Sequence, residues 1–368
     1  MRFSCAASEL QNALSVVTKA LASKSTLPVL EGVLLRAVDG QLELTCSDSS
    51  ITIVTELPAM VEEPGRVVLP GRLFTEVVRK MPAGEIHATM SASGVVTLKC
   101  LGSRTSITGM DAAQFPKLPE VNSDSVISMP QPLLKDMIQR TSFAIATEDT
   151  RQVLTGCLLD VSGGEARMVA LDGYRLAMRT ARVSDVDMKI SAIVPGKSLS
   201  ELGKLLGDDE DARVELCADK NMMHAKLPST DIYMRLIDGE FIDYRRILPT
   251  GWKSRIAVDC DQLRSCVDRA SLMAREGKNN LIKLELSGDE MIITSNSEIG
   301  DVHEELEVEH EGDDLLIAFN VKYVIDAVRA IDDEQVSMRF NSGVSPCVIA
   351  PLEGDGYLYL VLPERINA

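Results

Sequence analysis

A few short segments of this sequence carry residue types that do chemistry in other proteins. Residues 195–198 read Pro-Gly-Lys-Ser, which is also how a phosphate-binding loop ends, but that loop needs a glycine five residues before Gly196, where this chain has Ser191. The histidines lack the His-Glu-x-x-His spacing that holds catalytic zinc; they are His87, His224, His303 and His310. Residues 303–310 instead alternate like a strand with a polar face. The sequence therefore predicts no phosphate loop and no zinc site of this kind.

Acidic residues also lack catalytic spacing. Residues 207–213 read Gly-Asp-Asp-Glu-Asp-Ala-Arg, which is typical of a charged turn rather than of paired catalytic carboxylates. No Gly-x-Ser-x-Gly or Gly-x-Gly-x-x-Gly motif occurs. We therefore expect a protein that is not an enzyme, with no catalytic residue, metal or cofactor. A metal-dependent hydrolase that uses the acidic clusters stays open as the alternative.

The eight cysteines contain no Cys-x-x-Cys pair, which argues against a zinc site and a disulfide framework. We expect them to be small buried hydrophobic residues in a reducing cytoplasm; they are Cys5, Cys46, Cys100, Cys157, Cys217, Cys260, Cys266 and Cys347. The first residues lack the apolar stretch of a signal peptide, and no run of about 18 apolar residues occurs. These features predict a soluble cytoplasmic protein with no membrane partner.

Cations show the most regular spacing in the chain. They form pairs seven residues, or two helical turns, apart, so both members of a pair lie on one helix face; the pairs are Arg72 with Arg79, Lys197 with Lys204, and Lys322 with Arg329. The formal net charge is −17, so basic residues confined to equivalent helices predict contact with a shared polyanion. The alternative is a solvated face on which an acid such as Glu76, below Arg72, forms a helix pair of about 0.2–0.5 kcal/mol.

These cations belong to one segment that occurs three times. Residues 68–81, 194–206 and 319–331 align without a gap, and Pro70, Pro195 and Asn320 stand at two equal steps of 125. In the first copy we expect an amphipathic helix whose apolar residues cover a sheet; they are Leu73, Phe74, Val77, Val78 and Met81.

A second landmark has nearly the same period. Asp48, Asp172 and Asn296 stand at two steps of 124, each after an apolar, strand-like run, and each predicts a turn. A further amphipathic segment near the start of each copy contains Leu10, Leu134 and Leu263. This period is too long for a solenoid, so we expect three similar domains, 1–123, 124–249 and 250–368. The linkers fall near 119–125 and 249–253.

Each predicted domain contains two helical segments separated by alternating apolar runs that hairpin turns connect. Examples of such runs are VVTLKCLG, which ends at Gly102, and KLELSGDEMIITS, which begins at Lys283. Two helices packed on mostly antiparallel sheets make an α+β domain. Its sheets present edges that either are protected or pair with something else.

Five stretches carry a resemblance to a known family. They are STLPVLEGVLL (25–35), LDGYRLA (171–177), DGEFIDYRRILP (238–249), FNVKYVIDAV (319–328) and YLVLPERI (359–366). With them the chain resembles the bacterial DNA polymerase III β subunit, the sliding clamp family. The resemblance implies a DNA clamp fold of three similar domains, and two protomers that form a closed ring around duplex DNA. A triplicated scaffold unrelated to DNA is the remaining alternative.

The resemblance also implies a function and partners. A clamp is a processivity factor that slides on double-stranded DNA without sequence specificity. It tethers the replicative DNA polymerase, the clamp loader, repair polymerases and other clamp-motif proteins. Leu272 and Met273 fall in a stretch that contributes to the homodimer interface in the family.

Two site predictions follow from the resemblance. Lys24 and Arg72 match DNA-contacting positions, and Arg151 and Gln152 are the best candidates in the loop 147–153, where Glu148 would repel phosphate. The repeated helices add Arg79, Lys197 and Lys204 to the predicted DNA-binding residues.

The second implied site is a groove between the second and third domains that binds a short peptide of a partner protein. Its predicted residues are Leu154, Leu171, Gly173, Tyr174, Arg175, Leu176, Ile242, Arg246, Ile247, Asn320, Tyr323, Val344, Pro346, Leu360, Leu362, Pro363, Glu364 and Arg365. Such an apolar trough with a few polar groups suits an extended peptide with aliphatic and aromatic anchors, although the leucines and isoleucines could equally be core. Leu171, Ile242 and Glu364 depart from the commoner residues of the family, and Glu364 would favour a basic flank on the ligand.

Overall fold

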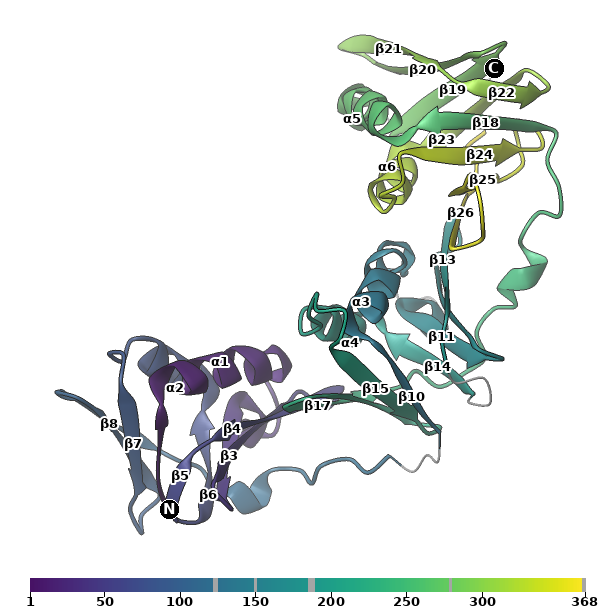
Figure 1. The fold of residues 1–368 in the computed structure, drawn as a ribbon. Coiled ribbons are helices and arrows are strands. Elements are labelled where there is room, and N and C mark those ends of the chain that lie inside the picture. Colours follow the sequence, from purple (N-terminus) through teal and green to yellow (C-terminus); the bar gives the residue numbers. More distant parts are fainter. Residues whose placement is uncertain (122–124, 149–150, 185–188, 278–279, 366–368) are drawn as a thin grey trace. The chain divides into compact units, whose positions relative to one another are not determined.

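The computed structural model describes residues 1–121, 125–148, 151–184, 189–277 and 280–365 (Figure 1). The chain divides into two compact units. The first contains Met1–Pro132 and Lys197–Leu236, and the second contains Leu133–Gly196 and Ile237–Ala368. The middle third of the sequence is thus shared between the two units, and each unit is described by itself.

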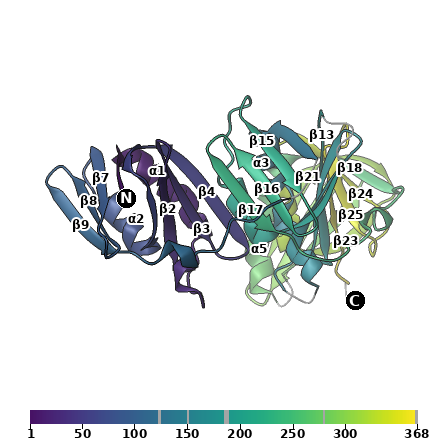
Figure 2. The ribbon, with the colours of Figure 1, turned by 90° about the horizontal axis from the view of Figure 1, so that it is seen from below.

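The first unit contains two antiparallel sheets, whose strands lie side by side in Figures 1 and 2. The eight-stranded sheet has the order β10 (Val126–Pro130), β15 (Arg213–Ala218), β16 (Met222–Leu227), β17 (Thr230–Arg235), β4 (Ile51–Pro58), β3 (Gln41–Ser47), β2 (Gly32–Val38) and β6 (Gly65–Pro70). The five-stranded sheet has the order β5 (Met60–Glu63), β1 (Arg2–Ala6), β7 (Glu85–Met90), β8 (Val95–Cys100) and β9 (Ser103–Thr108). The pairing of β17 with β4, which aligns Thr230 with Thr55, joins strands from two predicted domains into one sheet.

Helices α1 (Ala7–Val17), α2 (Gly71–Arg79) and α4 (Gly196–Gly203) belong mainly to this unit. In α2, Phe74 and Val78 are fully buried, and Met81 just after the helix is buried as well. The prediction that Leu73 covers the sheet is wrong, because its side chain is 53% exposed. Phe74 and Val78 lie one turn apart on the inner face, and Leu73, one residue earlier, is rotated away from it.

The second unit also contains two antiparallel sheets. The nine-stranded sheet has the order β14 (Ile190–Pro195), β11 (Gly156–Ser162), β12 (Glu165–Leu171), β13 (Arg175–Arg182), β26 (Tyr357–Val361), β25 (Cys347–Pro351), β24 (Gln335–Phe340), β18 (Ser254–Asp259) and β22 (Glu309–Gly312). The four-stranded sheet has the order β21 (Gly300–Glu307), β20 (Glu290–Ser297), β19 (Leu281–Ser287) and β23 (Leu315–Asn320). In β19, Ile282, Leu284 and Leu286 are buried while their neighbours are less so, as expected for a strand with one covered face.

Helices α3 (Gln131–Gln139), α5 (Cys260–Glu276) and α6 (Val321–Arg329) belong mainly to the second unit. Two of them begin at side chains that accept a hydrogen bond from a free backbone N–H. The Asp259 carboxylate accepts from the N–H of Gln262 at 2.8 Å, and the Asn320 side chain accepts from the N–H of Lys322 at 3.1 Å. Asn320, the third-copy equivalent of Pro70 and Pro195, therefore starts its helix by a different mechanism from the prolines.

The predicted turns at Asp48 and Asp172 are confirmed and have the same geometry. The Asp48 carboxylate accepts hydrogen bonds from the N–H groups of Ser50 and Ile51, both at 2.9 Å. The Asp172 carboxylate likewise accepts hydrogen bonds from the N–H groups of Tyr174 at 2.9 Å and Arg175 at 3.0 Å. The residue after each aspartate is left-handed, with φ of 75° at Ser49 and 94° at Gly173. Only the glycine adopts this conformation without a steric cost.

The third predicted turn is wrong. Asn296 lies inside β20 and pairs with Asp301 of β21, so the chain reverses at residues 298–299 instead. The ladder between β20 and β21 continues past Asn296, and backbone pairing therefore replaces the side-chain turn seen in the first two copies. The charged segment 207–212 does lie in the predicted turn between α4 and β15.

The cysteines are free, and all of them except the half-buried Cys217 are buried, as predicted. Burial raises the pKa of Cys157 to about 12, so its thiol stays neutral. Within the described residues, no group of three or more His, Cys, Asp or Glu side chains is placed to hold a metal ion. No helix in the described part of the chain has the length and apolar character to span a membrane.

Candidate functional site

Arg175 is the central residue of a polar cluster in the second unit. Its side chain is 7% exposed at the first position of β13. Its guanidinium donates to the carboxylates of Asp172 at 3.0 Å and Asp326 at 2.6 Å, and to the carbonyl oxygen of Phe143 at 2.6 Å. A buried cation is tolerated when it is paired and fully hydrogen-bonded. Arg175 thereby ties the 172–175 turn to α6 and to the short helix η4 (Ser142–Ala144).

Two tyrosines form the exposed rim above this arginine. The rings of Tyr174 and Tyr323 stack with centroids 5.7 Å apart and planes 15° from parallel. The central guanidinium carbon of Arg175 lies 4.8 Å from the centroid of the Tyr323 ring. Burial, together with the nearby Asp172 carboxylate, raises the pKa of Tyr323, so its hydroxyl stays protonated at neutral pH. Tyr174 is 57% exposed, which leaves an amphipathic aromatic surface available to a ligand.

The segment after β26 is held beside this rim by backbone hydrogen bonds. The N–H of Leu362 donates to the carbonyl oxygen of Tyr174 at 2.9 Å, and the N–H of Glu364 donates to the carbonyl oxygen of Ala318 at 2.8 Å. Leu362, Pro363 and Glu364 are half-buried. The last described residues of the chain therefore form a fixed wall between the 172–175 turn and β23.

The floor of the site is a buried apolar cluster. It contains Leu154, Leu171, Leu176 and Leu360, all at most 6% exposed. Ile242 and Leu362 pack against the cluster and stay partly exposed. The sequence left open whether these residues belong to the core or line the groove. The buried leucines are core, and only the partly exposed side chains can touch a ligand directly.

A cavity of about 600 Å³ opens beside the tyrosines. Five predicted groove residues line it, namely Leu154, Gly173, Tyr174, Arg175 and Tyr323. Arg151, which was predicted to bind DNA, lines it as well. The sequence reasoning missed Ile145, Ala146 and Lys322, which also line it. The position of Lys322 between Asn320 and Tyr323 was the available signal. A concave site of this size with an apolar floor and a few fixed polar groups is typical of peptide or small-ligand binding.

Three family models match the chain in succession. They describe the N-terminal, central and C-terminal domains of the DNA polymerase III beta subunit and match residues 1–119, 128–243 and 245–365. The chain is 34% identical over 362 residues to the "Beta sliding clamp" of Staphylococcus aureus strain Mu50, covering 96% of both chains. The chain belongs to the DNA polymerase III beta subunit family.

Solved structures of beta subunits agree with this assignment. The Bacillus subtilis DNA polymerase sliding clamp superposes with a TM-score of 0.97 at 32% identity, and the Pseudomonas aeruginosa DNA polymerase III subunit beta with a TM-score of 0.94 at 31% identity. Each comparison covers 100% of both chains. The predicted three-domain clamp fold, with helices packed on antiparallel sheets, is therefore confirmed.

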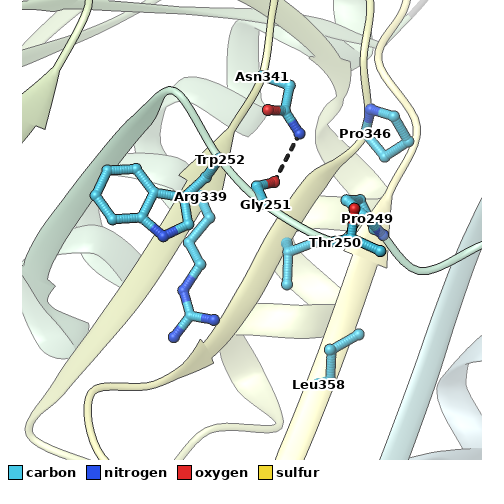
Figure 3. A pocket seen from close by; sticks show the side chains of 9 residues that line it. Pro249, Thr250, Gly251, Trp252, Arg339, Asn341, Pro346 and Leu358 are labelled. Atoms are coloured by element: carbon cyan, nitrogen blue, oxygen red, sulfur yellow. Dashed lines mark hydrogen bonds between the residues drawn. The ribbon is translucent and has the colours of Figure 1, made fainter.

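Other predicted groove residues of this beta subunit lie outside the 600 Å³ cavity. Val344 is 78% exposed and Ile247 is 41% exposed. Arg246 is exposed and pairs with Asp243 at 3.0 Å, and Arg365 is exposed. Pro346 lines a second cavity of about 270 Å³, which Figure 3 shows.

The predicted DNA-binding cations of the first unit are all exposed, but several are already paired with acids. Lys197 forms an ion pair with Asp48, Lys204 pairs with Glu201 at 2.8 Å, and Arg79 pairs with Glu76 at 2.6 Å. The alternative of a solvated face with helix ion pairs named Glu76 as a partner of Arg72; Glu76 instead pairs with Arg79, three residues after it on the helix.

The other two cations of this unit differ from the paired ones. Arg72 makes a long contact of 3.5 Å to the carbonyl oxygen of Ser23, and Lys24 is exposed in the same loop as Ser23. Neither belongs to an ion pair among the described residues, whereas Arg79, Lys197 and Lys204 do. In the second unit, Arg151 and Gln152 are exposed at the start of η5 (Gln152–Thr155), and positions 149–150 of the predicted loop lie outside the described residues.

The predicted interface residues lie on α5. Leu272 is 60% exposed, which is unusual for a leucine in the middle of a helix that packs on a sheet. Met273 is half-buried, and its sulfur accepts a hydrogen bond from the Ser297 hydroxyl at 3.9 Å. Leu272 thus presents an apolar side chain to solvent in the isolated chain.

Proposed function

We propose that this chain is a DNA polymerase processivity factor. Two copies form a closed ring around duplex DNA, slide without sequence preference and hold the replicative polymerase on its template. The observation that carries this proposal is the full-length match to proteins named sliding clamp, with 96% coverage of both sequences and a TM-score of 0.97 over both whole chains. We assign the domains as 1–123, 124–249 and 250–368, with Leu272 and Met273 in the dimer interface.

The arrangement of charge supports a sliding contact rather than a tight one. A net charge of −17 repels DNA from most of the surface, while the predicted DNA-binding cations of the first unit are exposed on or just after α2 and α4 and in the loop of Lys24. Non-specific contacts to phosphate have dissociation constants of roughly 10⁻⁴–10⁻⁶ M at physiological salt. The ion pairs of Arg79, Lys197 and Lys204 weaken these contacts further, because an acid already competes for each cation. Retention on DNA then depends on the closed ring.

The groove of the second unit binds the partner proteins. Tyr174, Tyr323 and Leu362 offer aromatic and aliphatic surface beside a fixed backbone, which suits the anchors of an extended peptide. The partners are the replicative polymerase, the clamp loader, repair polymerases and other clamp-motif proteins. Binding near 1 μM, about −8 kcal/mol, lets them exchange on one ring. The protein acts in the cytoplasm, without catalysis or a cofactor.

A topological experiment tests the proposal. The protein is loaded by its clamp loader onto a nicked circular plasmid, and the complex is separated from free protein by gel filtration. We expect the protein to stay with the circle and to be lost when a restriction enzyme linearises the plasmid, because a ring runs off free ends. Equal retention on circular and linear DNA contradicts the proposal. Images of the purified protein that lack a central opening also contradict it.

A further inference from the structure

A second cavity lies where the segment 249–252 crosses the end of β24 (Figure 3). Its volume is about 270 Å³. Two hydrogen bonds fix its outer wall, because the Asn341 side chain donates to the carbonyl oxygen of Gly251 and the N–H of Lys253 donates to that of Phe340, both at 2.9 Å. The cavity is therefore part of the folded structure and not a gap beside a loose loop.

The lining combines apolar surface with one cation. Pro249, Pro346, Val348 and Leu358 supply aliphatic surface, and Trp252 is 41% exposed at the edge. Trp252 is also the single tryptophan of the chain. Tryptophan is enriched at interfaces, because its large ring is apolar while its N–H can donate a hydrogen bond.

The cation is Arg339 of β24. Its side chain is half-buried, and its Nε donates to the Ser337 hydroxyl at 3.3 Å. No described carboxylate forms an ion pair with Arg339, whereas Arg255, its partner on the neighbouring strand β18, pairs with Glu311 at 3.8 Å. In a chain of net charge −17, a half-buried guanidinium without an acidic partner leaves its terminal nitrogens available to an external carboxylate.

The cavity borders the apolar cluster that forms the groove floor. Val348 belongs to the same buried cluster as Leu171, Leu176 and Leu360, and Leu358 packs against that cluster. Pro346, one of the predicted groove residues, also lines this cavity, so the predicted groove and the cavity share a wall.

We propose that this cavity binds an acidic segment that flanks the groove-binding peptide of a partner protein. A carboxylate of the segment pairs with Arg339, and an adjacent proline or aliphatic side chain packs on Trp252 and Pro249. This inference rests on the proposed function, because it extends the peptide that the groove binds. Nucleic acid fits less well, since phosphate binding relies on several cations and this cavity combines one with apolar walls.

Intrinsic fluorescence gives a direct test, because excitation of the single tryptophan reports on this cavity alone. The probes are peptides from the tail of the organism's replicative polymerase, without tryptophan, extended at either end by Asp-Pro-Asp or by Ser-Pro-Ser. We expect one Asp-Pro-Asp peptide to bind about three- to tenfold more tightly than its Ser-Pro-Ser counterpart and to shift Trp252 emission. Arg339→Glu and Arg339→Gln should each abolish both the gain in affinity and the shift in Trp252 emission.

The variants can be controlled for folding and for total charge. Ser337 keeps a hydrogen bond from Arg255 Nε at 3.1 Å when Arg339 is replaced, so we expect the same melting midpoint. Arg182→Glu, at an exposed position of β13, makes the same change in net charge and should leave the gain intact.

Equal binding of the acidic and serine peptides overturns this inference and leaves the proposed function standing. A gain that survives in both Arg339 variants, or a Trp252 shift caused by duplex DNA and not by the acidic peptide, overturns it as well. If no peptide binds, the groove assignment fails first and this inference fails with it.

Discussion

The guanidinium of Arg175 lies under the ring of Tyr323, 4.8 Å from its centroid. The same guanidinium is hydrogen-bonded to Asp172, which directly precedes Gly173, and to Asp326, which follows Tyr323 by three residues. A buried charge cluster therefore determines where the exposed aromatic rim sits. The rim and the cluster should respond together to mutation.

We expect Arg175→Lys to weaken both stability and peptide binding. Lysine cannot reach Asp172, Asp326 and the Phe143 carbonyl at once, so at least one buried polar group loses its partner. The cost should be about 2–4 kcal/mol, lowered somewhat because Asp326 is partly exposed. Scanning calorimetry measures the change in the unfolding transition. An unchanged midpoint would mean that the cluster is not structurally important.

Tyr323→Ala and Leu362→Ala should each weaken binding of a polymerase-tail peptide by at least about tenfold, as for central hot-spot residues. Tyr323→Phe keeps the stacked ring and is the matched control, which should retain most of the affinity. Fluorescence anisotropy of a labelled peptide measures the dissociation constants of the three variants. If the alanine variants bind like the parent protein, the groove lies elsewhere.

Asp48 should make folding of the first unit pH-dependent. Burial alone would raise its pKa, but hydrogen bonds from Lys197, Ser50 and Ile51 lower it overall. A carboxyl whose pKa is depressed by folding stabilises the fold above its unfolded pKa of about 3.9, and this contribution is lost as the pH falls through the folded pKa.

The matching variant is Asp48→Asn. It should destabilise the protein at pH 7 by at most about 1 kcal/mol, because Lys197 is largely exposed. The difference from the parent protein should shrink as the pH falls from the unfolded pKa through the lower folded pKa of Asp48, below which both proteins are uncharged at this position. Thermal unfolding at several pH values measures the difference. A constant difference across this range would exclude the ion pair as its cause.

Free and paired cations should contribute differently to DNA binding. Replacing Lys24 and Arg72 together by Ala should weaken binding of a duplex and lower the slope of log K against log salt by roughly one per cation. Lys204→Ala should have a smaller effect, because Glu201 already neutralises that cation. Anisotropy titrations between low and moderate salt measure both slopes. Equal effects per replaced cation would show that the ion pairs break on DNA.

Leu272→Asp should convert the proposed dimer into monomers, because a charge at the centre of an apolar contact is left unpaired. Val126→Asp is the matched control, since Val126 is an exposed apolar residue of β10 with 44% exposure. Sedimentation velocity at micromolar concentration distinguishes the two states. A dimeric Leu272→Asp protein would remove this residue from the interface.

Much of the fold was predictable because the chain repeats itself. Periodicity located the six α-helices of the described residues, and the spacing of Asp48 and Asp172 located two turns of equal geometry. The turn predicted at Asn296 was wrong because its backbone pairs within the long hairpin of β20 and β21. The burial predicted for Leu73 was wrong because a single helical period does not distinguish the centre of a buried face from its edge.

Pairings between distant segments could not be predicted. Lys197 meets Asp48 across 149 positions, and nothing in either segment specifies the other. The cavity of Trp252 and Arg339 likewise joins residues 249–252 to β24, β25 and β26, so it exists only after the sheet has formed. The turn residues 172–175 and the helix start at Asn320 were visible in sequence because each is built from its own neighbours.

The state of the cysteines has a practical consequence. Seven thiols are buried, and burial holds the pKa of Cys5 and Cys157 at about 12 and that of Cys260 at about 11, so these groups react slowly with electrophiles. Replacing the half-buried Cys217 by Ser gives a background into which one surface cysteine can be introduced for maleimide dyes. Distances between protomers, and the opening of an assembled particle, then become measurable by energy transfer in single molecules.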